Sequence, residues 1–206
     1  MGAVVWQFEN NPATQASQCT EQELYRTLKG ISESKYSDRS EPIIFDKGRM
    51  WPMPLIMETM GKVHGEPIKI VATVRPIAEC IASFYSIDPI DIPIELWIKG
   101  SSLFTHLMMS YEALKAGYEK YPNQFCLIEY DDLVSNTQEC LNRISDFLGV
   151  DHIPYAPEIK QVEENDNAWG IEDLHKLSPN ISKTAMDTRG ILGNALYELY
   201  QGGEFW

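Results

Sequence analysis

The sequence predicts an α/β fold in which a parallel β-sheet carries helices on its faces. Two apolar runs support this prediction, IKIVATV at 68–74 and FCLIEY at 125–130. Neither run alternates between apolar and polar residues, which is typical of parallel strands that are covered on both faces. A helical pattern follows each run, and strands that alternate with helices indicate a parallel sheet. We expect a single domain over 1–206, with its core at 42–150 and an irregular C-terminal region at 151–206.

The composition is that of an ordinary globular protein. The chain has 206 residues, of which 44% are apolar and 23% charged, enough for one hydrophobic core. A net charge of −13 makes nucleic acid and anionic membranes poor partners. No window of about 18 uncharged apolar residues predicts a membrane span, and the N-terminus lacks the features of a signal peptide. We therefore expect a cytoplasmic protein with neither a membrane nor a nucleic-acid partner.

Cysteine and histidine residues are dispersed along the chain. None of the four cysteines forms a C-x-x-C motif, and none has a histidine at the spacing of a metal site. This pattern indicates buried free thiols in a reducing compartment, and it predicts no metal cofactor. The cysteines are Cys19, Cys80, Cys126 and Cys140.

The first third of the chain predicts two helices with a short strand between them. TEQE at 20–23 matches the capping-box pattern and opens a short helix. The polar stretch SESKYSDRSE at 32–41 predicts a loop, and PIIFD at 42–46 predicts a short buried strand. RMWPMPLIMETMGKVHG at 49–65 predicts a turn and then a helix that ends near its last glycine.

The middle of the chain predicts a strand and two helices. The strand at 68–74 leads into a helix at Pro76, because proline is favoured at the first helical position. DPIDIPIE at 88–95 predicts a proline-rich loop, and a long amphipathic helix is expected from about Leu103 to Tyr121.

The last third begins with the strand at 125–130. DDLVSN then leads into a helix whose apolar face ends just before Gly149. The remainder is less regular, with an acidic loop EENDN at 163–167 and a short amphipathic helix NALYELY at 194–200.

Arg75 and Ser83 form a candidate anion site. Arg75 follows the strand at 68–74, and ligands of parallel sheets bind at the carboxyl ends of strands. On a helical wheel of the next helix, Ser83 lies at nearly the same angle as Pro76 and away from the apolar stripe. A guanidinium fork and a hydroxyl could then hold one anion together. The alternative is a surface Arg75 that pairs with Glu79, beside a solvated serine.

Two segments resemble sulfotransferases that use PAPS (3′-phosphoadenosine-5′-phosphosulfate). IKIVATVRPIAECIASFY is similar to their 3′-phosphate-binding segment, in which a serine lies eight residues after an arginine. FCLIEYDDLVSNTQECLNRISDFLGV resembles their next landmark, an apolar strand with a Tyr-Glu-Asp-Leu-like motif and a helix ending in Phe-Leu-Gly. The two segments occur in the family's order and cover about 42–150. The resemblance implies a fold of the P-loop nucleotide-hydrolase type.

The resemblance also implies roles for individual residues in binding PAPS as co-substrate. Arg75 and Ser83 would hold the 3′-phosphate of the nucleotide. TRGILGN at 188–194 faintly resembles the loop that closes over the nucleotide, although it lacks that loop's lysine, and this makes Arg189 a candidate. Lys176 and Lys183 are weaker candidates in the same region.

IIFDKGRMWP lies where the family places its acceptor-side catalytic residues. Sulfonyl transfer needs a base for the acceptor hydroxyl and positive charge on the transferred and leaving oxygens. Asp46 is the candidate base, and Lys47 and Arg49 are the candidate cations. The alternative is that Asp46 caps a turn while the two basic side chains are solvated.

The sequence does not contain the Gly-rich loop with which the family opens. That loop, of the type Pro-Arg-Ser-Gly-Thr-Thr, holds the 5′-phosphosulfate. We therefore expect an N-terminally incomplete version of the fold. A sheet without that strand has unpaired edges, so we expect a homo-oligomer, or the segment AVVWQF at 3–8, to cover an exposed edge.

The resemblance implies an enzyme that transfers a sulfonate from PAPS to a hydroxyl or amine acceptor. The alternative is a non-catalytic module of the same fold that binds a nucleotide or another protein. A nucleotide kinase is disfavoured because it also needs the Gly-rich loop. The expected partners are the nucleotide co-substrate and an acceptor that the sequence does not identify.

Overall fold

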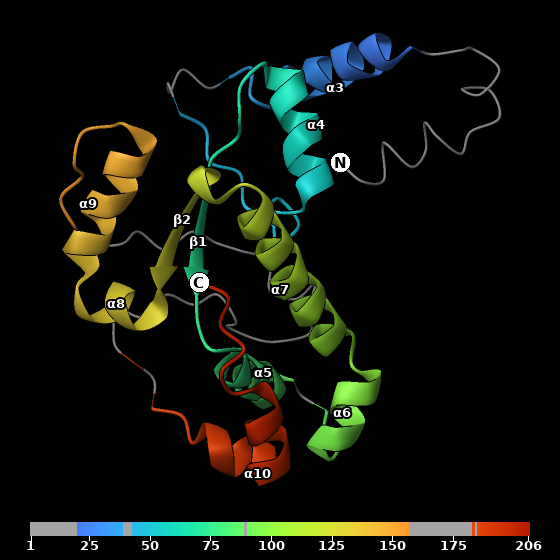
Figure 1. Ribbon diagram of the computed structural model, residues 1–206, viewed down its shortest axis with the longest axis vertical. Coiled ribbons are helices and arrows are strands. Elements are labelled where there is room, and N and C mark those ends of the chain that lie inside the picture. Colours follow the sequence, from blue (N-terminus) through green and yellow to red (C-terminus); the bar gives the residue numbers. More distant parts are fainter. Residues whose placement is uncertain (1–19, 39–42, 89, 157–182, 184) are drawn as a thin grey trace. The chain divides into compact units, whose positions relative to one another are not determined.

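A computed structural model describes residues 20–38, 43–88, 90–156, 183 and 185–206 (Figure 1). The chain divides into two compact units, Met1–Ile68 and Lys69–Trp206, which are described separately. The expectation of a single domain stays a prediction. The first unit contains α3 (Glu21–Lys35) and α4 (Pro54–His64). The second contains β1 (Ile70–Val74), α5 (Ile77–Ile87), α6 (Ile94–Gly100), α7 (Ser102–Lys120), the short 3₁₀ helix η1 (Pro122–Gln124), β2 (Phe125–Glu129), α8 (Tyr130–Ser135), α9 (Thr137–Leu148) and α10 (Thr188–Tyr200).

Helix α3 begins at the predicted capping box. The Thr20 hydroxyl accepts a hydrogen bond from the Glu23 amide, and the Glu23 carboxylate accepts one from the Thr20 amide at 2.7 Å. These two bonds engage two amides at the start of the helix. The capping-box prediction is confirmed.

Helix α3 is longer than its sequence pattern predicts. It continues to Lys35, so the predicted loop at 32–41 is wrong over its first four residues. Ser32 is only 3% exposed, and its hydroxyl lies 3.3 Å from His64 Nε2 at the end of α4. Packing of α3 against α4 therefore extends the helix into a polar stretch that by itself favours a loop.

The predicted strand at 42–46 is wrong in its described part. Residues 43–46 form no strand, and the side chains of Ile44 and Phe45 are 47% and 71% exposed. A short apolar run becomes a strand only where a neighbouring backbone completes its hydrogen bonds. The apolar pattern alone could not show that this partner is missing among the described residues.

The second unit contains a parallel sheet, as the sequence predicts, and in the described part of the chain this sheet has two strands. Val74 pairs with Glu129 at the carboxyl end of the ladder. Arg75 and Tyr130, which directly follow the two strands, therefore leave the sheet at the same level. In Figure 1 the strand pair lies between α9 and α7.

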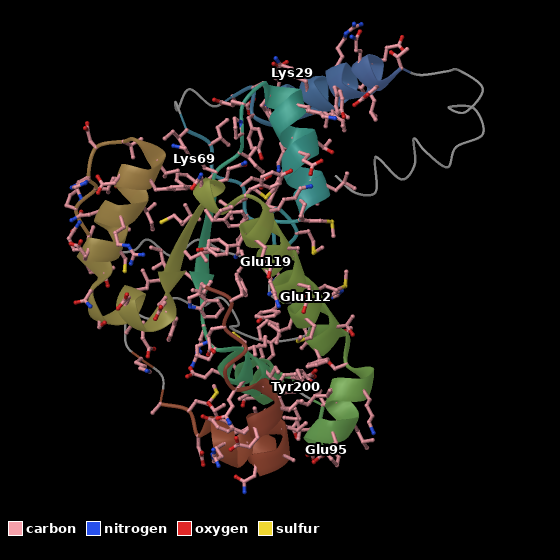
Figure 2. The ribbon with its side chains drawn as sticks, viewed as in Figure 1. Lys29, Lys69, Glu95, Glu112, Glu119 and Tyr200 are labelled. Atoms are coloured by element: carbon pink, nitrogen blue, oxygen red, sulfur yellow. The ribbon has the colours of Figure 1, made fainter. Side chains whose placement is uncertain are left out.

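The core of the second unit is built around α5. Ile81 and Ala82 are fully buried there, together with Trp97 of α6. Aromatic edge-to-face contacts continue this core from Trp97 to Phe104 and from Phe104 to Tyr200 of α10, with ring centroids 5.7 and 6.4 Å apart. Figure 2 labels Tyr200 at the end of α10.

Helix α6 was not predicted. It includes the last two residues of the predicted loop at 88–95, so that prediction is wrong at Ile94 and Glu95. Pro93 occupies the N-cap position, and the helix begins at Ile94. Seven residues are too few for helical periodicity to be recognised in a sequence. The Trp97 indole nitrogen donates to the Asp88 carboxylate at 2.7 Å, which fixes the preceding loop.

Helix α9 packs on β2, and two features cap its C-terminal end. Gly149 adopts the left-handed conformation with φ of 76°. Lys69, labelled in Figure 2, donates to the carbonyl oxygens of Phe147 and Leu148 at 2.7 and 3.2 Å. A buried cluster between the helix and the strand contains Cys126, Ile128 and Cys140.

Helix α10 contains the helix expected at 194–200 but starts earlier, at Thr188. Gly193 is non-helical, with φ of 70° and ψ of 161°, and divides α10 into two helical pieces. Leu192 is buried against the α5 core. The acidic loop expected at 163–167 lies outside the described residues.

Candidate functional site

Arg75 lies directly after β1, at the carboxyl end of the sheet. Its Nε donates to Glu79 Oε2 at 2.7 Å, and its guanidinium carbon lies 4.6 Å from the centre of the Tyr130 ring. The Arg75 side chain is only 18% exposed. The ion pair with Glu79, which the sequence left open as an alternative, is therefore present.

No hydrogen bond from a described residue engages the outer edge of the Arg75 guanidinium. Among the described residues, only Nε is engaged in a hydrogen bond, so Nη1 and Nη2 keep their donors. These nitrogens form the planar fork that binds two oxygens of a phosphate. The ion pair and the Tyr130 ring restrict the directions in which this fork can point.

Ser83 lies on α5, four residues after Glu79. Residues at this spacing share a helix face, so Ser83 lies on the face that also carries the partner of Arg75. Its side chain is half-buried. Ile77 and Ile81 are buried as the helical wheel predicts. A joint role of Arg75 and Ser83 at one phosphate stays a prediction.

A second ion pair lies at the carboxyl end of β2. Lys183 Nζ contacts Asp131 Oδ2 at 2.5 Å. The hydrogen bond to Asp131 raises the pKa of Lys183, and the charges of Glu79 and Arg75 shift that pKa in opposite directions. Two cations and two carboxylates thus lie within electrostatic range of each other at this edge of the sheet.

Asp46, the candidate base, is engaged within the first unit. Its Oδ2 accepts hydrogen bonds from Lys35 Nζ at 2.8 Å and from the Tyr36 hydroxyl at 2.7 Å. Burial raises the pKa of Asp46, but the hydrogen bonds from Lys35 and Tyr36 outweigh it, so the pKa lies below its usual value. The carboxylate is therefore ionised at neutral pH, and it ties the end of α3 to the segment at 43–53.

Lys47 and Arg49, the candidate cations, are both exposed. The cation in contact with the Asp46 carboxylate is Lys35, which precedes it by eleven residues. Arg49 also interacts with another group. The catalytic roles of Asp46, Lys47 and Arg49 stay predictions.

Arg189 spans the kink of α10. Its Nη1 donates to Asn194 at 3.1 Å and its Nη2 to Glu198 at 2.7 Å. The guanidinium carbon lies 4.4 Å from the centre of the Tyr197 ring. These contacts join the helical pieces before and after Gly193 and engage one N–H of each terminal nitrogen, so each of these nitrogens keeps a second N–H.

Comparison with protein-family models matches residues 1–188 to the sulfotransferase domain. The chain belongs to the sulfotransferase domain family. The resemblance and the α/β fold expected from the sequence are therefore confirmed, and the family has a P-loop-like fold. The searches of curated proteins and of solved structures found no match.

Sequence reasoning missed three residues next to the candidates of this sulfotransferase domain. Tyr130 follows β2 just as Arg75 follows β1, and two residues that end neighbouring parallel strands are expected to meet. That signal was present in the sequence. Lys35 and Tyr36 reach Asp46 only because α3 extends to Lys35, which the polar sequence did not indicate.

Two searches of the described part of the sulfotransferase domain gave negative results. No group of three or more histidine, cysteine, aspartate or glutamate side chains there is placed to hold a metal ion. None of the helices described is long and apolar enough to cross a membrane.

Proposed function

We propose that this sulfotransferase domain binds PAPS and transfers its sulfonate to a hydroxyl or amine acceptor. In this reaction the bond from sulfur to the 5′-phosphate oxygen breaks, and a bond from sulfur to the acceptor oxygen or nitrogen forms. The acceptor loses a proton, and adenosine 3′,5′-bisphosphate leaves. Arg75, Ser83 and Arg189 are the proposed nucleotide-binding residues.

The position of Arg75 is the observation that supports this function most. It stands at the carboxyl end of β1 with its side chain only 18% exposed, and among the residues that the structure describes neither terminal nitrogen is in a hydrogen bond. A 3′-phosphate is a compact anion that this fork can bind in bidentate fashion. The ring of Tyr130 and the carboxylate of Glu79 hold the guanidinium in place before the ligand arrives.

The acceptor side is proposed to use Asp46, Lys47 and Arg49. The ionised Asp46 carboxylate is in the form that accepts a proton. Its lowered pKa, however, makes it a weak base, because proton affinity falls with pKa. Removal of Lys35 or Tyr36 from the carboxylate during the reaction would restore its basicity.

A non-catalytic nucleotide-binding module is the second candidate function. The contacts of Asp46 favour it, since Lys35 and Tyr36 already occupy one oxygen of the only proposed base. Such a module would bind the nucleotide through Arg75 and Ser83 without releasing a sulfated product.

Ligand binding and product formation separate these functions. Adenosine 3′,5′-bisphosphate should raise the melting temperature of the protein, because a ligand that binds only the folded state stabilises it by about 2.7 kcal/mol at 100 times its Kd. Incubation with PAPS and a panel of phenols, alcohols and amines, followed by mass spectrometry, tests transfer. Sulfated product supports the enzyme, and binding without product supports the module. No thermal shift at millimolar ligand contradicts both.

A further inference from the structure

Three large apolar side chains are exposed within ten residues where α5 leads into α6. Ile87 at the end of α5 is 39% exposed, Ile90 in the loop is 51% exposed, and Leu96 on α6 is 56% exposed. A single exposed apolar residue is ordinary on a protein surface, whereas several gathered in one segment mark an interaction site. These three residues are called the α6 patch below.

The exposure of Leu96 follows from the way α6 packs. Ile94 and Trp97 are 7% and 0% exposed, so they define the side of α6 that faces the core. At 100° per residue, Leu96 lies about 200° around the helix from Ile94, on the opposite side. Leu96 therefore contributes to the surface of the protein rather than to its core.

Hydrogen bonds hold the loop of the α6 patch in one conformation. Asp88 accepts a hydrogen bond from the Trp97 indole at 2.7 Å and one from the Ile90 amide at 3.2 Å. The Tyr85 hydroxyl donates to the Ile92 carbonyl at 2.7 Å. The loop is thus tied to both α5 and α6, and a surface that is already ordered loses less conformational entropy when it binds a partner.

The charges beside the α6 patch favour a basic partner. Asp91 and Glu95 are exposed, and Glu95 is labelled on α6 in Figure 2. Between positions 87 and 100 the sequence has three carboxylates and one basic residue, Lys99. Since opposite charges attract a partner and like charges repel it, this rim disfavours an anionic membrane. It also disfavours a second copy related by a two-fold axis, because that interface would bring two acidic rims together.

We propose that the α6 patch is a docking surface for a polypeptide segment that combines aliphatic and basic side chains. Ile87, Ile90 and Leu96 cover the aliphatic side chains of this segment, and Asp91 and Glu95 pair with its bases at the rim. The inference goes beyond the proposed function. The patch begins at Ile87, which α5 separates from the Arg75 end of the helix by about 15 Å at 1.5 Å per residue.

The test uses a short fluorescein-labelled peptide of leucine and lysine, with binding to the full chain followed by fluorescence anisotropy. Leu96→Ser should weaken binding about tenfold, because the burial of one leucine is lost. Ile153→Ser is the matched control, since it removes a side chain that is 61% exposed in the segment after α9. This control should bind like the wild type. Equal affinity in Leu96→Ser and the wild type, with unchanged circular dichroism spectra, would overturn the proposal.

A second pair of variants separates a defined rim from the general attraction of an acidic protein for a basic peptide. Glu95→Lys should weaken binding several-fold, and the loss should shrink as salt is added. Glu119→Lys makes the same change at an exposed position of α7, labelled in Figure 2, and should have much less effect. Equal losses in the two variants would overturn the assignment to the α6 patch. A peptide with serine in place of leucine should bind much more weakly than the leucine peptide.

The other two occupants are tested with the same Leu96→Ser variant. Sedimentation with phosphatidylserine vesicles tests a membrane, and light scattering over a range of concentrations tests a second copy. Vesicle binding or self-association that disappears in Leu96→Ser would assign the α6 patch to that occupant and overturn the proposal. Peptide binding that depends on Leu96 and Glu95, without either of these effects, supports it. The test needs no nucleotide, so its outcome is independent of the proposed function.

Discussion

Arg75 illustrates how a charged side chain is prepared at the end of a strand. One ion pair fixes its Nε, and one ring supports the flat face of its guanidinium. An arginine that is already ordered loses less conformational entropy when it binds a ligand. The rotamer held by Glu79 and Tyr130 should therefore contribute to affinity even though neither group needs to touch the phosphate.

The first prediction concerns the geometry of this fork. Arg75→Ala should lower the affinity for adenosine 3′,5′-bisphosphate by at least a hundredfold, because the two parallel hydrogen bonds from the guanidinium to the phosphate are lost. Arg75→Lys should recover only part of it, since an ammonium cannot form two parallel bonds. Calorimetric titration measures both. Wild-type affinity in Arg75→Ala, with an intact circular dichroism spectrum, would remove Arg75 from the site.

The second prediction concerns the ion pair of Asp46. Its folded-state pKa is depressed below the unfolded value of about 3.9. The pair should thus stabilise the fold fully above pH of about 4, and this contribution should be lost as the pH falls through the folded-state pKa. Urea unfolding of the wild type and of Asp46→Asn measures it as a difference in free energy of unfolding.

That difference should be largest at neutral pH and should shrink as the solution is acidified below pH of about 4. A difference that stays constant from neutral to acid pH would contradict the structural role of Asp46. Transfer activity of the same variant tests the catalytic role separately, because a purely structural aspartate would leave the rate per folded molecule unchanged.

For single residues, the sequence predicts the place in the fold better than it predicts which side chains they contact. Arg75 was recognised from its place after a strand, and that place is correct. Its contact with Tyr130 was not predicted, although both residues directly follow neighbouring parallel strands in which Val74 pairs with Glu129. Asp46 was a candidate because its segment lies where the resembling family places acceptor-side catalytic residues, whereas its observed contacts come from the end of α3.

Helix α9 shows what secures the end of an element. The left-handed Gly149 and the ammonium of Lys69 both satisfy carbonyl groups that the last turn leaves without partners. Because Lys69 directly precedes β1, this contact also joins the start of the strand to the end of a helix 78 residues later. The contact thereby fixes the position of the strand relative to the helix.

The third prediction tests this helix end. Gly149→Ala should destabilise the protein by about 1 kcal/mol, because alanine is strained at a positive φ. No atom lies within 4 Å of the added methyl group, so the penalty comes from the backbone alone. Gly100→Ala is the control, since that glycine has equally free surroundings and an ordinary φ. It should be neutral or slightly stabilising in thermal unfolding, and equal losses in both variants would contradict the argument.

At the level of elements, long or strongly patterned segments were predictable. Both strands of the sheet and the helices α4, α5, α7 and α9 follow from apolar periodicity and from glycine or proline at their ends. The errors occur where tertiary packing decides. Burial of Ser32 extends α3, exposure of Phe45 accompanies the absent strand, and burial of Trp97 stabilises the short α6.

At the scale of the whole molecule, an acidic protein binds an anion only where its few cations gather. The net charge is −13, yet two cations lie together at the carboxyl edge of the sheet. The general field repels a nucleotide, so the affinity must come from direct contacts. The family could be predicted from the order of two sequence landmarks, and the pairing of Arg75 with Glu79 was one of two alternatives, whereas the pairing of Lys183 with Asp131 was not expected.

The fourth prediction concerns the oligomeric state. Among the described residues, each strand of the sheet pairs along one edge only. Exposed strand edges favour pairing with another chain, and we therefore expect a homo-oligomer of the 23.5 kDa chain. Light scattering coupled to size-exclusion chromatography measures the mass. A monomeric mass at concentrations of tens of micromolar would contradict the expectation.

The buried thiols between α9 and β2 have a practical consequence. Cys140 is 1% exposed and Cys126 is 9% exposed, and burial raises the pKa of both thiols. Alkylating reagents attack the thiolate and need access to sulfur, so iodoacetamide should modify these residues only when α9 separates from the sheet. With reagent in excess, the labelling rate followed by mass spectrometry would measure how often this layer opens, and a nucleotide bound at the sheet edge should slow it.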